Sequence, residues 1–283
     1  MSNGSGSSPT SRIFTPAVRM RCARPESSAR PRHEHPPDAS VAMKAMVLAA
    51  GRGTRLRPLT DSVPKPMIPI GDRPLLEHVV NLLRQHGFDD LVINLSHLPD
   101  KIRDHFGNGS AFDVSIRYSL EPRMLGTAGA LGPVADHFRD EDFLVYYADN
   151  LTNADLGALW RDHLAAGAAM TVGLLWMPDP AGRGIVGLDE NGRIDRWLEK
   201  PEPDQVFDDY LINGGIYAVH PHVLDTIAST GSPDFAHDVL PELLADGQHL
   251  YGHRLQGQLF STDTPERYEA TLRAVESGAF SPP

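Results

Sequence analysis

The feature that most constrains the fold is a short, wholly apolar run that ends in a glycine-rich, basic loop. Residues 45–50 read Ala-Met-Val-Leu-Ala-Ala, and Gly51 and Gly53 follow directly. A run of this length without polar alternation is typical of a strand buried on both faces, as in a parallel sheet. Such a strand needs helices on both sides of its sheet, so the sequence predicts an α/β fold.

The remainder of the chain from residue 43 alternates between strand-like and helix-like patterns. Apolar runs predict strands at 91–95, 114–118, 143–147 and 170–175, and helical spacing predicts helices at 74–86, 99–106, 129–138 and 156–166. This alternation indicates βαβ units, hence a mostly parallel central sheet flanked by helices.

The second half of the chain has a different pattern. Asn191-Gly192 lies between apolar segments at 184–188 and 194–198, which predicts a β-hairpin. Further strands are expected at 212–219, 250–255 and 259–262, and helices at 221–228, 233–245 and 265–276.

Composition divides the chain into an extension and a body. Residues 1–42 are rich in Ser, Pro, Gly and Arg and lack periodic apolar residues, so we expect a disordered extension. Its Arg- and Ser-rich composition also suits a transit peptide, although no amphipathic stretch supports that reading. We expect residues 43–283 to form one domain.

Charge and cysteine content narrow the class of protein. The net charge of −11 argues against a nucleic-acid partner, and no apolar run is long enough for a membrane span. The single cysteine excludes an intrachain disulfide framework, which fits a cytoplasmic protein.

The loop after the first strand concentrates positive charge in an otherwise acidic body. It carries Arg52, Arg55 and Arg57, and Lys65 lies just beyond. Arginine pairs with phosphate oxygens in a two-pronged way, lysine acts as a point charge, and glycine lets backbone N–H groups approach closely. The cluster therefore predicts a polyphosphate ligand. The P-loop pattern is absent, and the dinucleotide fingerprint lacks its third glycine.

These motifs resemble those of the sugar-1-phosphate nucleotidylyltransferases, most closely the mannose-1-phosphate guanylyltransferases. The resemblance begins with Gly-Arg-Gly-Thr-Arg-Leu at 51–56 and Pro-Lys-Pro at 64–66. It continues through Leu-Gly-Thr-Ala-Gly-Ala-Leu at 125–131, Glu-Lys-Pro at 199–201 and Ile-Asn-Gly-Gly-Ile-Tyr at 212–217. It covers nearly all of residues 43–275 and implies a Rossmann-like nucleotidyltransferase fold. The implied reaction joins a sugar 1-phosphate to a nucleoside triphosphate and releases pyrophosphate.

The resemblance also implies roles for individual residues. Arg55 and Lys65 would hold the triphosphate and stabilise charge at its α-phosphate. The remaining substrate-binding residues that it implies are Ala50, Gly51, Gly53 and Thr54 in the loop, Gly126 and Thr127 at the base, and Gly184, Glu199, Lys200 and Asn213 at the sugar.

A magnesium ion is the implied cofactor, with Asp149 and Asp263 as its predicted carboxylates. Asp149 follows a predicted strand, where open α/β sheets bind ligands, although the family has Gly or Ser in place of Ala148. A gapless match to the family places Ser261 at the second metal position, and a one-residue gap places Asp263 there. Residues 261 and 263 lie on the same side of an extended segment. Asp263 is equally suited to cap the helix expected from Pro265.

Several functional readings remain open on the sequence. The resemblance favours mannose 1-phosphate and GTP as the substrates. The alternatives are glucose, heptose, cyclitol or N-acetylmuramate phosphates with UTP, dTTP or CTP. A catalytically weak regulatory homologue that binds a nucleotide sugar is another reading, supported by Ala148 and Ser261. A homodimer is the expected assembly for this architecture.

Overall fold

A computed structural model describes residues 42–180, 183–230 and 234–283. The predicted disordered extension therefore lies outside the described residues, apart from Ala42. The large sheet consists of β1 Met43–Leu48, β4 Phe88–Leu95, β5 Ser115–Leu120, β6 Phe143–Tyr147, β8 Met170–Leu175, β9 Ile185–Leu188, β10 Ile194–Leu198, β11 Leu211–Val219 and β12 Leu250–Arg254.

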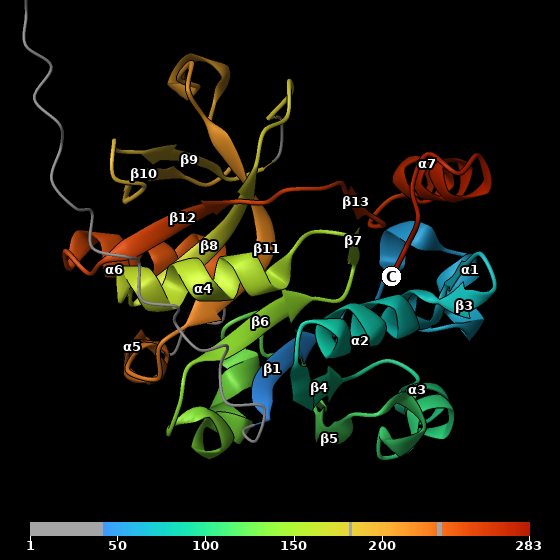
Figure 1. Cartoon of the computed structure of the whole chain (residues 1–283). Coiled ribbons are helices and arrows are strands. Elements are labelled where there is room, and N and C mark those ends of the chain that lie inside the picture. The colour runs from blue at the N-terminus through green and yellow to red at the C-terminus, as the bar shows by residue number, and fades with distance from the viewer. Residues whose placement is uncertain (1–41, 181–182, 231–233) are drawn as a thin grey trace, which may run out of the picture. The chain divides into compact units, whose positions relative to one another are not determined.

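The sheet is mixed, with a parallel half and a largely antiparallel half (Figure 1). Its strand order is β10-β9-β11-β6-β1-β4-β5, with β8 paired to β11 and β12 paired to β8. Strands β6, β1, β4 and β5 are parallel to one another, whereas β11 runs antiparallel to β6, β8 and β9. The predicted parallel core is confirmed, and so is the hairpin, since β9 and β10 pair antiparallel.

The α-helices connect and cover these strands. They are α1 Leu59–Ser62, α2 Leu75–Gln85, α3 Pro99–Phe106, α4 Leu156–Ala166, α5 Val223–Thr230, α6 Leu240–Ala245 and α7 Pro265–Glu276. The 3₁₀ helices are η1 Thr54–Leu56, η2 Lys65–Met67, η3 Ser110–Phe112, η4 Gly129–Phe138 and η5 Pro203–Gln205, and η6 Phe235–Val239 is a π-helix. The helix predicted over 233–245 is thus a π-helical turn followed by α6, and its first residue lies outside the described residues. The segment predicted as a helix at 129–138 is a 3₁₀ helix that contains Pro133, which lacks an N–H for the helical ladder.

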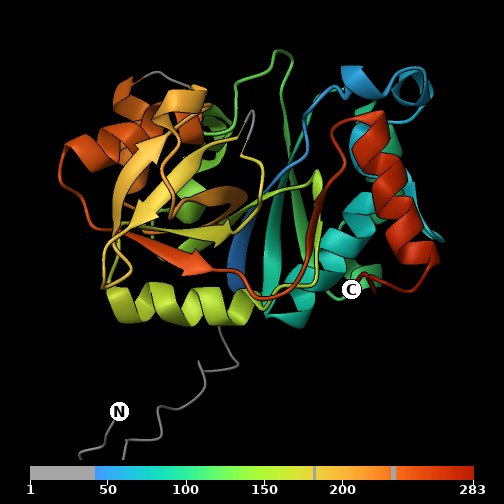
Figure 2. The same cartoon turned by 90° about the horizontal axis from the view of Figure 1, so that it is seen from above.

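Two apolar cores lie on the two faces of the sheet because successive side chains of a strand point to opposite sides. Ala45 and Val47 of β1 pack in a core that α2, α3 and α4 complete. Met46 packs on the other face, in a core that contains residues of η4, α5 and α6. The view from above shows α2 and α4 on one side of the sheet (Figure 2). The wholly apolar run identified in the sequence is therefore required by burial on both faces.

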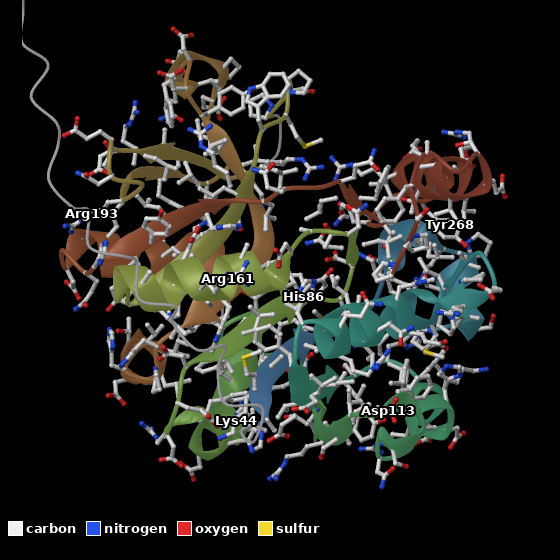
Figure 3. All side chains as sticks on the ribbon, viewed as in Figure 1. Lys44, His86, Asp113, Arg161, Arg193 and Tyr268 are labelled. Atoms are coloured by element: carbon white, nitrogen blue, oxygen red, sulfur yellow. The ribbon has the colours of Figure 1, made fainter. Side chains whose placement is uncertain are left out.

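A third, smaller core fixes the C-terminal segment beside the loop after β1. It contains Leu56, Ile68, Leu151 and Phe280, with side chains of α7 packed against it. Two short antiparallel pairs border it, namely β2 Pro69–Ile70 with β3 Arg73–Pro74, and β7 Asn150–Thr152 with β13 Leu259–Ser261. Tyr268 on α7, labelled in Figure 3, donates a hydrogen bond to the carbonyl of Pro69 at 2.7 Å. No helix among the described residues is long and apolar enough to cross a membrane.

Candidate active site

The loop after β1 is folded back so that it contacts Lys65. Gly53 has a φ of 62°, and its carbonyl accepts a hydrogen bond from the Thr60 hydroxyl at 2.8 Å. A Cβ atom on Gly53 would lie 2.9 Å from Cβ of Lys65, closer than such atoms approach. Glycine is required at this position both for the left-handed backbone and for the close approach of the lysine stem.

A cavity of about 300 Å³ opens at the carboxyl ends of the parallel strands. Six of the predicted site residues line it, namely Ala50, Gly51, Lys65, Gly126, Thr127 and Asp149. The other lining residues are Leu48, Ala49, Pro66, Asn94, Glu121, Met124, Tyr147, Ala148 and Asp234. Ligands of open α/β sheets bind at this edge, so the cavity is the candidate nucleotide site.

Lys65 and Asp149 form an ion pair in the wall of this cavity. Lys65 Nζ lies 2.8 Å from Asp149 Oδ2, and 10% of the lysine side chain is exposed against 36% of the aspartate side chain. Lys65 begins η2, and Asp149 lies between β6 and β7. The fold thereby joins a predicted phosphate-binding cation to a predicted metal carboxylate.

Arg55 makes a second ion pair, with Asp263. Arg55 Nη1 lies 3.0 Å from Asp263 Oδ2. The other carboxylate oxygen, Oδ1, accepts hydrogen bonds from Arg267 Nη1 at 2.8 Å and from the Ser261 hydroxyl at 3.1 Å. Burial favours a higher pKa for Asp263, but Arg267, Ser261 and Arg55 together hold the pKa below its ordinary value. Asp263 is therefore a carboxylate fixed between two guanidinium groups.

Asp263 does not cap the last helix, in contrast to one of the two roles considered for it. The N-cap of α7 is Thr264, whose side-chain oxygen accepts a hydrogen bond from the backbone N–H of Arg267 at 3.3 Å. The capping role therefore falls one residue later in the chain, which leaves the Asp263 side chain available for the arginines.

Residues expected at the sugar form a separate group that does not line the cavity. The backbone N–H of Asn213 donates to the carbonyl of Gly184 at 3.2 Å, and a Cβ atom on Gly184 would collide with the Glu199 carboxylate. Lys200 has a φ of 49°, an uncommon left-handed conformation for a residue with a side chain. Burial raises the pKa of Glu199; Lys200 offsets this partly, and Asp234 adds to it.

Hydrogen bonds connect this group to the cavity wall. Asn213 Nδ2 donates to the Tyr217 hydroxyl at 2.7 Å, and that hydroxyl lies 3.5 Å from the hydroxyl of Tyr147, a cavity residue. Asp234, also in the wall, accepts a hydrogen bond from the Thr127 hydroxyl at 3.1 Å. Gly53, Thr54, Arg55 and Asp263 lie outside the cavity lining, and Thr54 is exposed at the start of η1.

The sequence motifs did not predict two buried polar residues that line the cavity. Asn94 Oδ1 accepts a hydrogen bond from the Ala49 N–H at 2.6 Å, and its Nδ2 donates to Glu121 Oε1 at 2.8 Å. Glu121 Oε2 accepts from the Leu125 N–H at 3.0 Å, and only 2% of this glutamate is exposed. The available signal was an asparagine inside the apolar run at 91–95, because a buried amide there needs partners.

The described residues contain no group of three or more His, Cys, Asp or Glu side chains that could hold a metal ion. Magnesium differs from most protein-bound metals in needing only one or two carboxylates when substrate phosphates supply further ligands. Asp149 meets this requirement, since its carboxylate lines the cavity and is part-exposed.

A cavity at the carboxyl ends of parallel strands, walled by a glycine-rich loop and a buried lysine, is typical of α/β proteins that bind phosphorylated ligands. Comparison with known families makes the assignment specific. Residues 44–261 match the model of the nucleotidyl transferase family, and the chain belongs to that family. The family predicted from the sequence motifs is confirmed.

Curated relatives carry two different base specificities in their names. The chain is 37% identical over 248 residues to a UTP–glucose-1-phosphate uridylyltransferase of Synechocystis, covering 83% of this chain and 64% of that protein. It is 36% identical over 234 residues to a mannose-1-phosphate guanylyltransferase of Mycobacterium tuberculosis, covering 81% and 64%. The chain therefore spans about 64% of the length of these relatives.

A solved structure supports the fold independently. A UDP-glucose pyrophosphorylase in complex with UDP-glucose superposes with a TM-score of 0.73 at 19% identity, covering 84% of this chain and all of that one. The predicted Rossmann-like nucleotidyltransferase fold is confirmed.

Proposed function

We propose that this chain is a sugar-1-phosphate nucleotidylyltransferase that forms GDP-mannose and pyrophosphate from GTP and mannose 1-phosphate. The observation that carries the proposal is the Lys65–Asp149 pair in a cavity beside the glycine-rich loop. A phosphate oxygen of the sugar phosphate would bond to the α-phosphorus, and the bond from that phosphorus to the oxygen bridging to the β-phosphorus would break.

This chemistry needs positioning and charge neutralisation rather than a protein nucleophile. Lys65, mostly buried, is suited to stabilise charge that develops on the α-phosphate. Arg55 is suited to hold the remaining phosphates from the rim. Backbone N–H groups of Ala50, Gly51 and Gly53 would contribute further donors, with Thr54 beside them.

Magnesium is the proposed cofactor, and it would supply neutralisation of phosphate charge. Asp149, a part-exposed carboxylate of the cavity wall, would hold it. Asp263, the second predicted ligand, already bonds two arginines.

The acceptor is proposed to bind at the group formed by Gly184, Glu199, Lys200 and Asn213. The absence of a side chain on Gly184 leaves room at the Glu199 carboxylate. Lys200 has a left-handed backbone, and such uncommon conformations cluster at ligand sites, which supports a role in binding the phosphate of the acceptor.

Glu121 supports guanine as the base. A carboxylate accepts hydrogen bonds only, with about four lone-pair positions, and Asn94 and Leu125 occupy one on each oxygen. The two remaining acceptors match the adjacent N1–H and N2–H donors of guanine. Uracil and thymine present one donor between two carbonyl oxygens, which a carboxylate repels. Gly126 and Thr127 line the same cavity and would border the base.

The test is pyrophosphate release with Mg²⁺, in which each nucleoside triphosphate is paired with a panel of sugar 1-phosphates. Release with GTP and mannose 1-phosphate supports the proposal as stated. Release with another pair, such as UTP and glucose 1-phosphate, keeps the reaction and replaces the substrates. Nucleotide binding without release across the panel would favour the regulatory homologue, for which Ala148 and Ser261 are the sequence support.

A further inference from the structure

The carboxylate of Asp263 is surrounded by positive groups from three parts of the chain. Arg55 comes from η1 after the first strand, and Arg267 from α7. Burial lowers the pKa of Arg183, and Arg267 lowers it further while Asp263 raises it, so this third guanidinium lies in the field of the same groups. Asp179 also raises the pKa of Arg183, so three guanidinium groups and two carboxylates leave one net positive charge in a chain that is acidic overall.

The hydrogen bonds of Asp263 leave little capacity for a metal ion. A carboxylate has about four lone-pair positions, and Ser261, Arg267 and Arg55 occupy three of them. A divalent cation would also have to approach against the two bonded guanidinium charges. Asp149 differs in degree, because among the described residues its carboxylate pairs with one cation, Lys65, it lines the cavity, and its side chain is 36% exposed, against 13% for Asp263.

The backbone holds Asp263 in a fixed place next to the catalytic cavity. Ser261 pairs with Asn150 in the β7–β13 ladder, and both the N–H and the hydroxyl of Thr262 donate to the carbonyl of Asp149, at 3.0 and 3.1 Å. The Arg55 side chain, by contrast, is 67% exposed and long, so it needs an external anchor to hold one orientation.

We propose that Asp263 is a positioning residue that holds Arg55 and Arg267 for the substrate phosphates, and that it is not a metal ligand. This inference rests on the proposed function, since it assumes a nucleoside triphosphate at the cavity. In each arginine, some guanidinium N–H groups would remain hydrogen-bonded to Asp263. The other N–H groups would donate to the phosphates of the bound nucleotide. A guanidinium has five such donors, so both interactions coexist.

The experiment measures the Kd of GTP by calorimetry without any sugar phosphate, once with EDTA and once with Mg²⁺. The same titration is made with UTP. Wild type is compared with Asp263→Asn, Asp149→Asn, Arg55→Met and the Arg55→Met/Asp263→Asn double variant. Glu269→Gln removes an acid of α7 that forms an exposed ion pair with Arg273, and serves as the matched control.

Asp263→Asn is expected to weaken nucleotide binding about tenfold in both conditions, which leaves the ratio of the two Kd values unchanged. Asp149→Asn is expected to bring that ratio close to one. The losses in the double variant should be less than additive, because both changes remove the Arg55–Asp263 contact and only the part of the Asp263→Asn effect that acts through Arg267 remains. Arg55→Met alters an exposed side chain, so it remains informative if Asp263→Asn unfolds.

Four results would overturn the inference. If Asp263→Asn brings the Kd ratio close to one, Asp263 is a metal ligand. If its effect adds fully to that of Arg55→Met, or if it leaves both Kd values unchanged, it does not position Arg55. Wild type that binds neither nucleotide in either condition would overturn the proposed function itself, and the inference with it.

Discussion

Replacing Lys65 by Met removes one charge from the cavity wall and keeps most of the apolar stem that packs against Gly53. The variant separates two consequences of the ion pair with Asp149. One is its contribution to folding stability, and the other is its contribution to the reaction.

The expected loss of stability is small. Asp149 is 36% exposed in the ion pair, so water can solvate its carboxylate once the lysine is gone. A part-exposed pair of this kind contributes about 1 kcal/mol at most. For a domain of this size that corresponds to a decrease of about 2–4 °C in Tm.

The expected loss of activity is much larger. A preorganised donor directed at developing negative charge contributes about 3–4 kcal/mol, so we expect kcat to fall by about 10²- to 10³-fold. The assay is pyrophosphate release at saturating substrates, with Tm measured on the same samples.

Lys44→Met provides a matched control. Lys44 forms an ion pair with Glu141 at 2.7 Å, with side-chain exposures of 16% and 35%, close to those of the Lys65 pair. Lys44 lies near the amino end of β1 (Figure 3), whereas the glycine-rich loop follows the carboxyl end of that strand. A kcat of wild-type size in Lys65→Met, or an equal loss in Lys44→Met, would refute the role given to Lys65.

Three further changes test other parts of the site. Gly53→Ala and Gly167→Ala both place a Cβ on a left-handed backbone, at a cost of about 1–2 kcal/mol, but only Gly53 has Lys65 against it. We therefore expect a loss of Tm in both variants, larger in Gly53→Ala, and a loss of kcat in Gly53→Ala alone; equal activities would contradict this. Wild type should bind GTP about tenfold more tightly than inosine triphosphate, which lacks the 2-amino group, and Glu121→Gln should lose that preference. A preference that survives the change would exclude Glu121 as its source. Burial raises the pKa of Glu199 in the folded protein. The stability that this carboxyl group contributes is therefore complete below its ordinary pKa and is lost as the pH rises through its raised pKa. Glu199→Gln should raise Tm at pH 7 relative to wild type, with less gain near pH 4, and should weaken sugar-phosphate binding. Exposed Glu190→Gln is its control, and an equal shift there would show a general charge effect.

The sequence by itself determined the layered α/β architecture and the position of the ligand-binding loop. The apolar run at 45–50 has no polar alternation, and burial on both faces of β1 is the physical reason. The hairpin around Asn191-Gly192 followed from turn chemistry that needs no distant contact. The family followed from motifs in their order along the chain. The roles of single loop residues remain predictions, as does the disordered extension.

Only the tertiary structure decided which charged groups are partners. Arg55 and Asp263 are 208 residues apart in the chain, and their contact depends on the pairing of β7 with β13 and on the small core under α7. Thr264 takes the capping role, and Asp263 bonds both the distant Arg55 and Arg267, four residues along the chain. Glu121 has no local signal, since its burial and its bond to Asn94 arise where β4 and β5 end side by side. Periodicity reports which face a side chain occupies, whereas the partner it meets there depends on strand register across the sheet.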